Sequence, residues 1–180
     1  TIAGSSNITI GTGLDIAAAV QVGSGANVTP GGSFDISPTF NVGTGTYTLL
    51  YLSETAPRTT GFEVPPSRMV NNVVVNNTNG LTISGGILEV LNTLTLTNGI
   101  VNTTLANHIK HGSTTAAGTL SGGSTTSYVN GPLVRTIANG NTSFVLFPVG
   151  KTQYAPVSLA PATTDIVVMK AEAFDTNLGS

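Results

Sequence analysis

The sequence predicts an all-β fold, in which a parallel β-solenoid (β-helix) is followed by a β-sandwich-like cap. Short segments that are rich in β-branched residues or alternate in polarity recur along the chain, among them residues 47–52 (YTLLYL), 81–84 (LTIS) and 93–97 (TLTLT). Gly and Asn residues separate these segments, and both tolerate the positive φ angles that tight corners require. Related pieces recur at spacings near 20 residues, such as VGSG at 22–25 and VGTG at 42–45, which suits one coil of a solenoid.

We expect the solenoid to occupy residues 1–127 and the cap to occupy residues 128–180. Stacked coils would pair their strands in parallel, bury a column of Ile, Leu and Val, and turn Thr, Ser and Asn outward. Residues 53–68 contain three prolines and are expected to form a loop that leaves the solenoid, because proline does not sit in central strands. An antiparallel sandwich of the same short strands is the alternative. The helix-like stretch at 14–20 is short, so we expect almost no helix.

The regular alternation of strand segments and Gly/Asn turns ends at residues 128–159. Prolines, an arginine (Arg135) and three aromatic residues (Phe144, Phe147 and Tyr154) come together there. We expect these aromatic rings to form the core of the C-terminal unit. A cap at this point would cover the unpaired backbone groups and apolar core that an open solenoid end exposes.

The composition excludes several classes of function. Charged residues make up 8% of the chain, against about 25% in a typical soluble domain. With a net charge of −2 and 6 Lys and Arg residues, the chain is not expected to bind nucleic acid. It has no run of about 18 apolar residues, so we expect no membrane span. The absence of cysteine excludes disulfides and thiolate metal sites.

Three stretches resemble one family, the large secreted and cell-surface repeat proteins of gliding and marine Bacteroidetes that use the type IX secretion route. They are TYTLLYLSETAPRTTGFEVPPSRMVNNVVVNNTNGLTIS at 46–84, LNTLTLTNGIVNTT at 91–104, and YVNGPLVRTI at 128–137 together with FPVGKTQYAPVSL at 147–159. The resemblance implies a modular chain of β-solenoid and β-sandwich units that is associated with adhesion, surface structure or polysaccharide handling. It also implies an extracellular or cell-surface location.

From the repeats, the scarcity of charge and this resemblance, we expect a structural and adhesive segment of a long extracellular surface protein or fibre. Self-association into fibres through incompletely capped solenoid ends is a further expectation. The alternative is a carbohydrate-binding module of a secreted polysaccharide-degrading protein. In that case Tyr51 and Phe62 are the rings expected to stack on glycans.

We expect no catalytic, cofactor-binding or metal-binding residues, and therefore not an enzyme. The one histidine cluster, His108 and His111, has no acid near it in sequence, and the eight acids are scattered. The basic residues, Arg135 included, are isolated from one another. A catalytic solenoid would regain support from two buried carboxylates, or from His108 and His111 beside an acid in one cleft.

Overall fold

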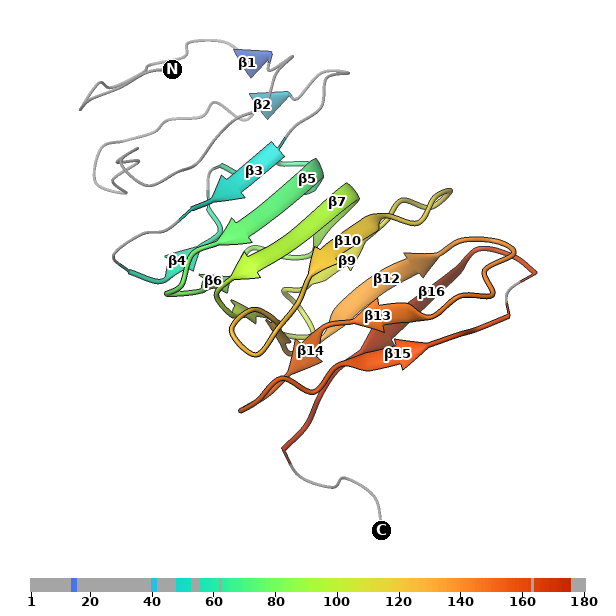
Figure 1. Cartoon of the computed structure of the whole chain (residues 1–180). Coiled ribbons are helices and arrows are strands. Elements are labelled where there is room, and N and C mark those ends of the chain that lie inside the picture. Colours follow the sequence, from blue (N-terminus) through green and yellow to red (C-terminus); the bar gives the residue numbers. More distant parts are fainter. Residues whose placement is uncertain are drawn as a thin grey trace.

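The computed structural model describes residues 14–15, 40–41, 48–52, 56–61, 63–162 and 164–175. These residues form strands, turns and loops, and no helix occurs among them (Figure 1). The strands stack as a parallel β-solenoid of about four turns, as the sequence predicts. Of the helix-like stretch at 14–20, the first two residues form a strand and the rest lies outside the described residues.

Within the described residues, sixteen strands follow one another. In chain order they are β1 (Leu14–Asp15), β2 (Phe40–Asn41), β3 (Thr48–Tyr51), β4 (Arg58–Thr59), β5 (Met69–Asn76), β6 (Leu81–Thr82), β7 (Leu88–Asn98), β8 (Val101–Asn102), β9 (Ile109–His111), β10 (Thr119–Gly122), β11 (Val129–Asn130), β12 (Leu133–Ile137), β13 (Val145–Phe147), β14 (Val149–Gly150), β15 (Val157–Leu159) and β16 (Val167–Ala171).

From β3 and β4 onwards, two sheets of the described residues run along the solenoid. The larger has the strand order β16-β12-β9-β7-β5-β3, and the smaller has the order β14-β11-β8-β6-β4. Neighbouring strands come from successive coils and pair in parallel, except for the antiparallel β12–β16 pair. In the smaller sheet Leu81 pairs with Val101 and Val129 with Val149, each pair twenty residues apart, whereas Val101 pairs with Val129, twenty-eight residues away, so only some coils have the spacing near 20 that the sequence predicts.

The core is a set of apolar columns, because each inward position stacks on the same position of the next coil. Leu81, Val101, Val129 and Val149 form one such column, and all four are fully buried. In the larger sheet, paired inward residues form the columns Leu49–Val73–Leu94–Leu120 and Leu88–Ile109–Leu133. Burying one such side chain contributes roughly 1.5–3 kcal/mol, so these columns are the main source of stability.

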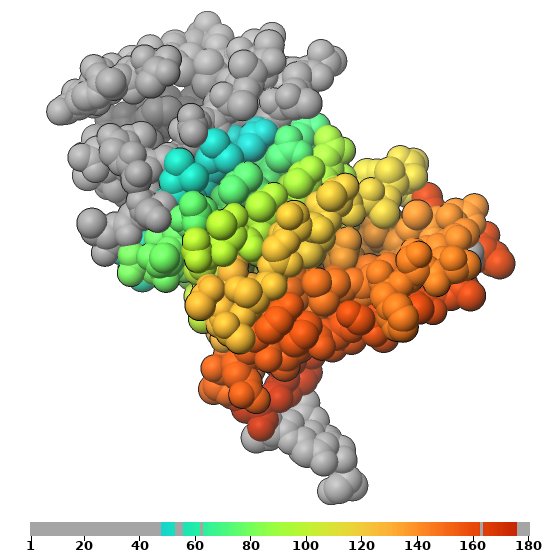
Figure 2. Space-filling view, viewed as in Figure 1, coloured from blue at the N-terminus to red at the C-terminus, as the bar shows by residue number. Residues whose placement is uncertain are grey.

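The long strand β7 pairs with two separate strands of the next coil. Its first part pairs with β9 and its second part with β10, and the loop 112–118 lies between those two strands. In the final coil (β12, β13 and β14) the loop 138–144 separates β12 from β13 in the same way. Strands β3, β5, β7 and β10 lie side by side across the face shown in Figure 2.

Antiparallel segments cover all three strands of the final coil. β16 pairs with β12, β15 pairs with β13, and Tyr154 forms a bridge to Gly150 at the end of β14. The Ala155 N–H also donates a hydrogen bond to the Val149 carbonyl at 3.0 Å. These segments occupy backbone groups that an open solenoid end would leave unpaired.

Two boundaries differ from the sequence prediction. Parallel pairing of β9 with β12 and of β11 with β14 carries the solenoid past residue 127 to Gly150, so the cap begins after β14. The predicted boundary is wrong because Gly131 (φ 119°) and Pro132 form a corner between two coil strands and do not end the stack.

The proline-rich segment 53–68 is not wholly outside the solenoid either. Strand β4 lies within it and pairs in parallel with β6, and Val64 joins the buried core. Its described prolines lie outside the strands, as expected for a residue without a backbone N–H. Residues 53–55 and Phe62 lie outside the described residues.

Replacing Gly99 by Ala should lower the free energy of unfolding clearly more than replacing Gly86 by Ala. Both glycines have positive φ angles, 92° and 110°, so each variant bears the strain of that backbone conformation, roughly 1–3 kcal/mol. At Gly99 the new Cβ would also overlap the Asn77 carbonyl of the neighbouring coil, whereas Gly86 faces open space. Urea unfolding measures both losses, and equal losses would contradict the close backbone approach at this corner.

Candidate functional site

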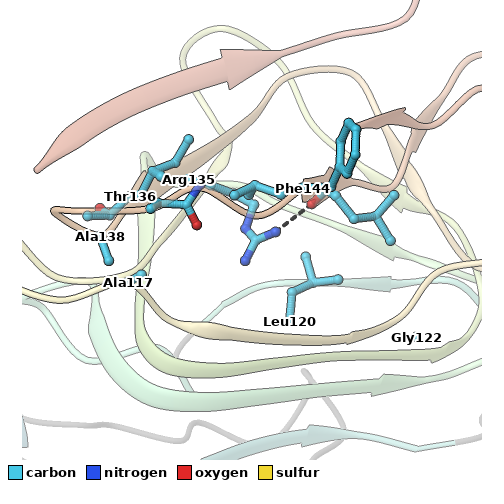
Figure 3. A pocket seen from close by; sticks show the side chains of 11 residues that line it. Ala117, Leu120, Gly122, Arg135, Thr136, Ala138 and Phe144 are labelled. Carbon is cyan, nitrogen blue, oxygen red and sulfur yellow. Dashed lines mark hydrogen bonds between the residues drawn. The ribbon is translucent and has the colours of Figure 1, made fainter. Parts of the chain in front are cut away.

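A cleft of ≈ 340 Å³ lies between the coil that contains β9, β10 and β11 and the final coil (Figure 3). We call it the Arg135 cleft. Its walls come from β10, β12 and β13 and from the two loops, 112–118 and 138–144. The lining residues are Ala117, Leu120, Gly122, Arg135, Thr136, Ile137, Ala138, Asn141, Phe144, Val145 and Leu146.

The cleft opens where the parallel ladder is interrupted. Within the described residues β10 pairs with β7, and β13 pairs with β15, but β10 and β13 do not pair with each other. Leu120, the last member of an inward column, is therefore half-buried and lines the cleft, whereas its partner Leu94 is fully buried. The geometry of the final coil thus leaves an apolar floor open to solvent.

Arg135 bridges this interruption from β12. Its Nη1 donates a hydrogen bond to the Leu146 carbonyl of β13, and its Nη2 donates to the Gly118 carbonyl at 3.4 Å. The guanidinium carbon lies 5.8 Å from the centre of the Phe147 ring, in a cation–π contact. Arg135 is 7% exposed, and this burial lowers its pKa, although a guanidinium stays protonated at neutral pH.

His111 lies next to Arg135 in the same inward position of the stack. Strand pairing places Val70, Val90, His111 and Arg135 in successive coils, so the column changes from apolar to polar towards the final coil. His111 is fully buried, and its Nε2 lies 3.1 Å from the Asn92 carbonyl. Burial, and then the charge of Arg135, lower the pKa of His111 to about 4, so the ring is neutral at pH 7.

Gly118 makes the buried imidazole fit. A Cβ on this residue would overlap His111 Nε2 and would lie 2.7 Å from the Asn92 carbonyl oxygen. The same glycine offers its carbonyl to Arg135. The end of the loop 112–118 is therefore shaped around the two inward-facing basic side chains.

Three buried polar atoms around the cleft have no hydrogen-bond partner. They are His111 Nδ1, Arg135 Nε and Thr136 Oγ1. Leaving a buried polar group unpaired costs about 1–3 kcal/mol, which is unusual in a folded core. Their grouping beside one cleft distinguishes this end of the solenoid from the apolar coils before it.

The structure contradicts the sequence expectation for Tyr51. Its ring is 1% exposed, packs in the core, and donates a hydrogen bond to Glu63 Oε1 at 2.9 Å. The prediction that it stacks on glycans is wrong, because the period-two pattern of β3 turns Leu49 and Tyr51 inward. Phe62, the second predicted stacking residue, lies outside the described residues.

The three C-terminal aromatic residues divide between core and surface. Phe147 is fully buried, Tyr154 is half-buried with its ring 6.0 Å from that of Tyr128, and Phe144 is 78% exposed. The expectation that all three form a core is wrong for Phe144. This residue ends the loop 138–144 and lines the Arg135 cleft (Figure 3).

His108 and His111 do not form a joint site. His111 faces the core from β9, while His108 precedes the strand, with its Nδ1 3.1 Å from the Leu105 carbonyl. Across the part of the chain that the structure describes, no three His, Asp or Glu side chains are grouped to hold a metal ion. No helix in that part is long and apolar enough to cross a membrane.

Sequence reasoning treated Arg135 as an isolated basic residue and missed its position in the cleft. A signal was present in Leu133–Ile137, because alternation places Arg135 on the same face as Leu133 and Ile137. The same reasoning in Ile109–His111 turns the histidine inward with Ile109. Chemically, the cleft offers a buried cation, an exposed aromatic ring and an apolar floor.

The stability of the protein should fall as the pH is lowered from about 6.5 to about 4 because His111 titrates in this window. Its folded-state pKa of about 4 lies below the unfolded value of 6.5, so the unfolded chain binds the proton more tightly. The stabilisation is fully present above pH 6.5, and about 3 kcal/mol is lost towards pH 4. Urea unfolding between pH 7 and pH 4.5 measures this loss.

The matched controls are His111→Asn and His108→Asn. His111→Asn should flatten the pH dependence in this window, even if it lowers stability at pH 7. His108→Asn is the matched control for the loss of a histidine, and the difference between the two variants measures the contribution of His111. An unchanged slope in His111→Asn would show that other groups cause the dependence.

The comparisons with known proteins give no relative for this chain. No protein-family model matches it, and neither a curated protein nor a solved structure is significantly similar to it.

Proposed function

We propose that the chain is a structural and adhesive segment of a long extracellular surface protein or fibre. The observation that carries this proposal is the in-register parallel stack from β3 to β12, which one continuous core fills. Such a stack makes a stiff rod, because each coil is held to the next by a backbone ladder and by buried columns. A rod of this kind suits a spacer that holds other modules away from a surface.

The polar surface of the rod also fits this role. Amide side chains of successive coils bond to one another, from Asn98 to Asn76 at 2.7 Å and from Asn130 to Asn102 at 2.9 Å. Lys110 and Glu89 form a surface ion pair at 3.0 Å on neighbouring strands. The electrostatic interactions of a surface that is solvated mainly by amides and hydroxyls change little with salt concentration, because few charges are present to be screened.

Self-association is proposed to run end to end through β16, the strand that lies outermost on the final coil. Strand β16 is the last strand of the larger sheet within the described residues, and Val168 on it is 56% exposed. An uncovered strand edge is a template for pairing with a second copy. We expect electron micrographs of the purified chain to show copies associated end to end.

Val168→Lys tests this proposal, because a second lysine beside the exposed Lys170 adds repulsion at the edge of β16. This variant should be dispersed at protein concentrations at which the original chain associates. Ile87→Lys, with the same change of charge at a residue 41% exposed, is the control and should still associate. Dispersed monomers of the original chain would contradict the fibre proposal.

A second candidate function is a carbohydrate-binding module of a secreted polysaccharide-degrading protein. The observation that favours it is the exposed ring of Phe144 at the edge of the Arg135 cleft. Aromatic rings at the edge of a cleft bind sugars by stacking against their apolar faces. Phe144 thus takes the place that the sequence assigned to Tyr51.

A further inference from the structure

We propose that the Arg135 cleft binds a carboxylate-bearing sugar, a uronate residue of an acidic polysaccharide, with the carboxylate on Arg135 and the ring against Phe144. This inference rests on the second candidate function, glycan binding, and names its ligand class. It follows from the charge, the geometry and the shape of the cleft.

The charge of Arg135 lacks a counter-ion. Among the described residues no carboxylate lies within ion-pair distance of it, and its hydrogen-bond partners are two neutral carbonyls. A buried, unpaired charge is costly, and a buried polar group without partners is rare in native structures. A carboxylate that enters the cleft would supply the missing counter-ion.

The guanidinium is held in place and retains donors for a ligand. A guanidinium carries five N–H groups, and protein carbonyls accept one from Nη1 and one from Nη2, so each of these two nitrogens keeps one N–H for a ligand. Figure 3 shows the guanidinium of Arg135 directed into the cleft on the side of Leu120. The carbonyl bonds and the Phe147 ring fix its orientation, so little entropy is lost when a carboxylate binds.

The remaining walls fit a sugar ring. Phe144 offers an exposed aromatic face, and Leu120 forms an apolar floor. A volume of ≈ 340 Å³ is at the lower end of the range for small-molecule sites. The cleft therefore suits a single sugar unit better than a larger ligand. The combination of a ring platform with one cation therefore matches a uronate.

A single carboxylate fits the charge better than a phosphate group. Phosphate sites commonly use several cations or a helix N-terminus, whereas Arg135 is the one cation among the lining residues and the described residues contain no helix. One guanidinium and one carboxylate also match in charge and in planar geometry.

Isothermal titration calorimetry on the full chain tests the proposal with three probes: oligogalacturonate, the methyl ester of the same oligosaccharide, and polyglutamate. The ester keeps the sugar ring and removes the charge, while polyglutamate keeps the charge and removes the ring. We expect oligogalacturonate to bind at least about tenfold more tightly than either, and its affinity to fall as salt rises.

Variants locate the binding in the cleft. Phe144→Ala should weaken oligogalacturonate binding by about tenfold, because it removes an exposed ring that the fold does not need. Phe174→Ala, at a residue 57% exposed outside the cleft lining, is the matched control and should bind as the original chain does. Arg135→Gln should abolish the preference for the acid over its ester, and Arg135→Lys should restore part of it; unfolding curves identify any variant that fails to fold.

The outcomes separate the inference from the function on which it rests. Equal binding of the acid and its ester would overturn the uronate assignment and leave glycan binding intact. Equal binding of polyglutamate would show simple charge attraction and would also overturn the assignment. Absence of binding to both saccharides, or an equal effect of Phe144→Ala and Phe174→Ala, would overturn a glycan site in the cleft.

Discussion

The parallel in-register ladder between successive coils is the constraint on which the rest of the structure depends. Because each residue pairs with its equivalent one coil away, a side chain at an inward position must match the residues above and below it. Columns of Leu and Val satisfy this requirement through most of the stack, as in Leu81, Val101, Val129 and Val149. The corners follow from the same constraint, since a side chain at Gly99 or Gly122 would enter the backbone of the neighbouring coil.

At the Arg135 cleft this backbone ladder between successive coils is interrupted. The loops 112–118 and 138–144 interrupt successive coils at equivalent points, and β13 then pairs with β15 and not with β10. Arg135 replaces the missing backbone bonds by reaching the carbonyls of Leu146 and Gly118. One side chain thus links the final coil to the preceding coil and places a charge in a half-open, largely apolar cleft. The structural and the ligand-binding interpretations therefore concern the same guanidinium.

The two inward basic residues have different consequences for the protein. His111 is neutral at pH 7 and affects stability only as the pH falls, because its burial opposes protonation. Arg135 stays charged and requires either acceptors or a counter-ion throughout. Their adjacency also explains why Gly118 approaches so closely, because a larger residue would displace the imidazole and the carbonyl that Arg135 contacts.

Local sequence by itself determined that the chain forms short strands and tight corners, but not the length of each coil. Period-two alternation and Gly or Asn corners are local signals, so the segments 47–52, 81–84 and 93–97, which overlap β3, β6 and β7, and the turns at Gly80, Gly99 and Gly122 could be predicted from neighbouring residues alone. The alternation of Arg135 with Val134 also indicated that Arg135 points inward. It did not indicate that the guanidinium lines a cleft. Only the tertiary structure decided that β10 and β13 do not pair, that Phe144 lies at the surface beside Arg135, and that Tyr51 is buried. These features depend on contacts between residues far apart in sequence, and no local pattern specifies which edges of two distant strands will meet.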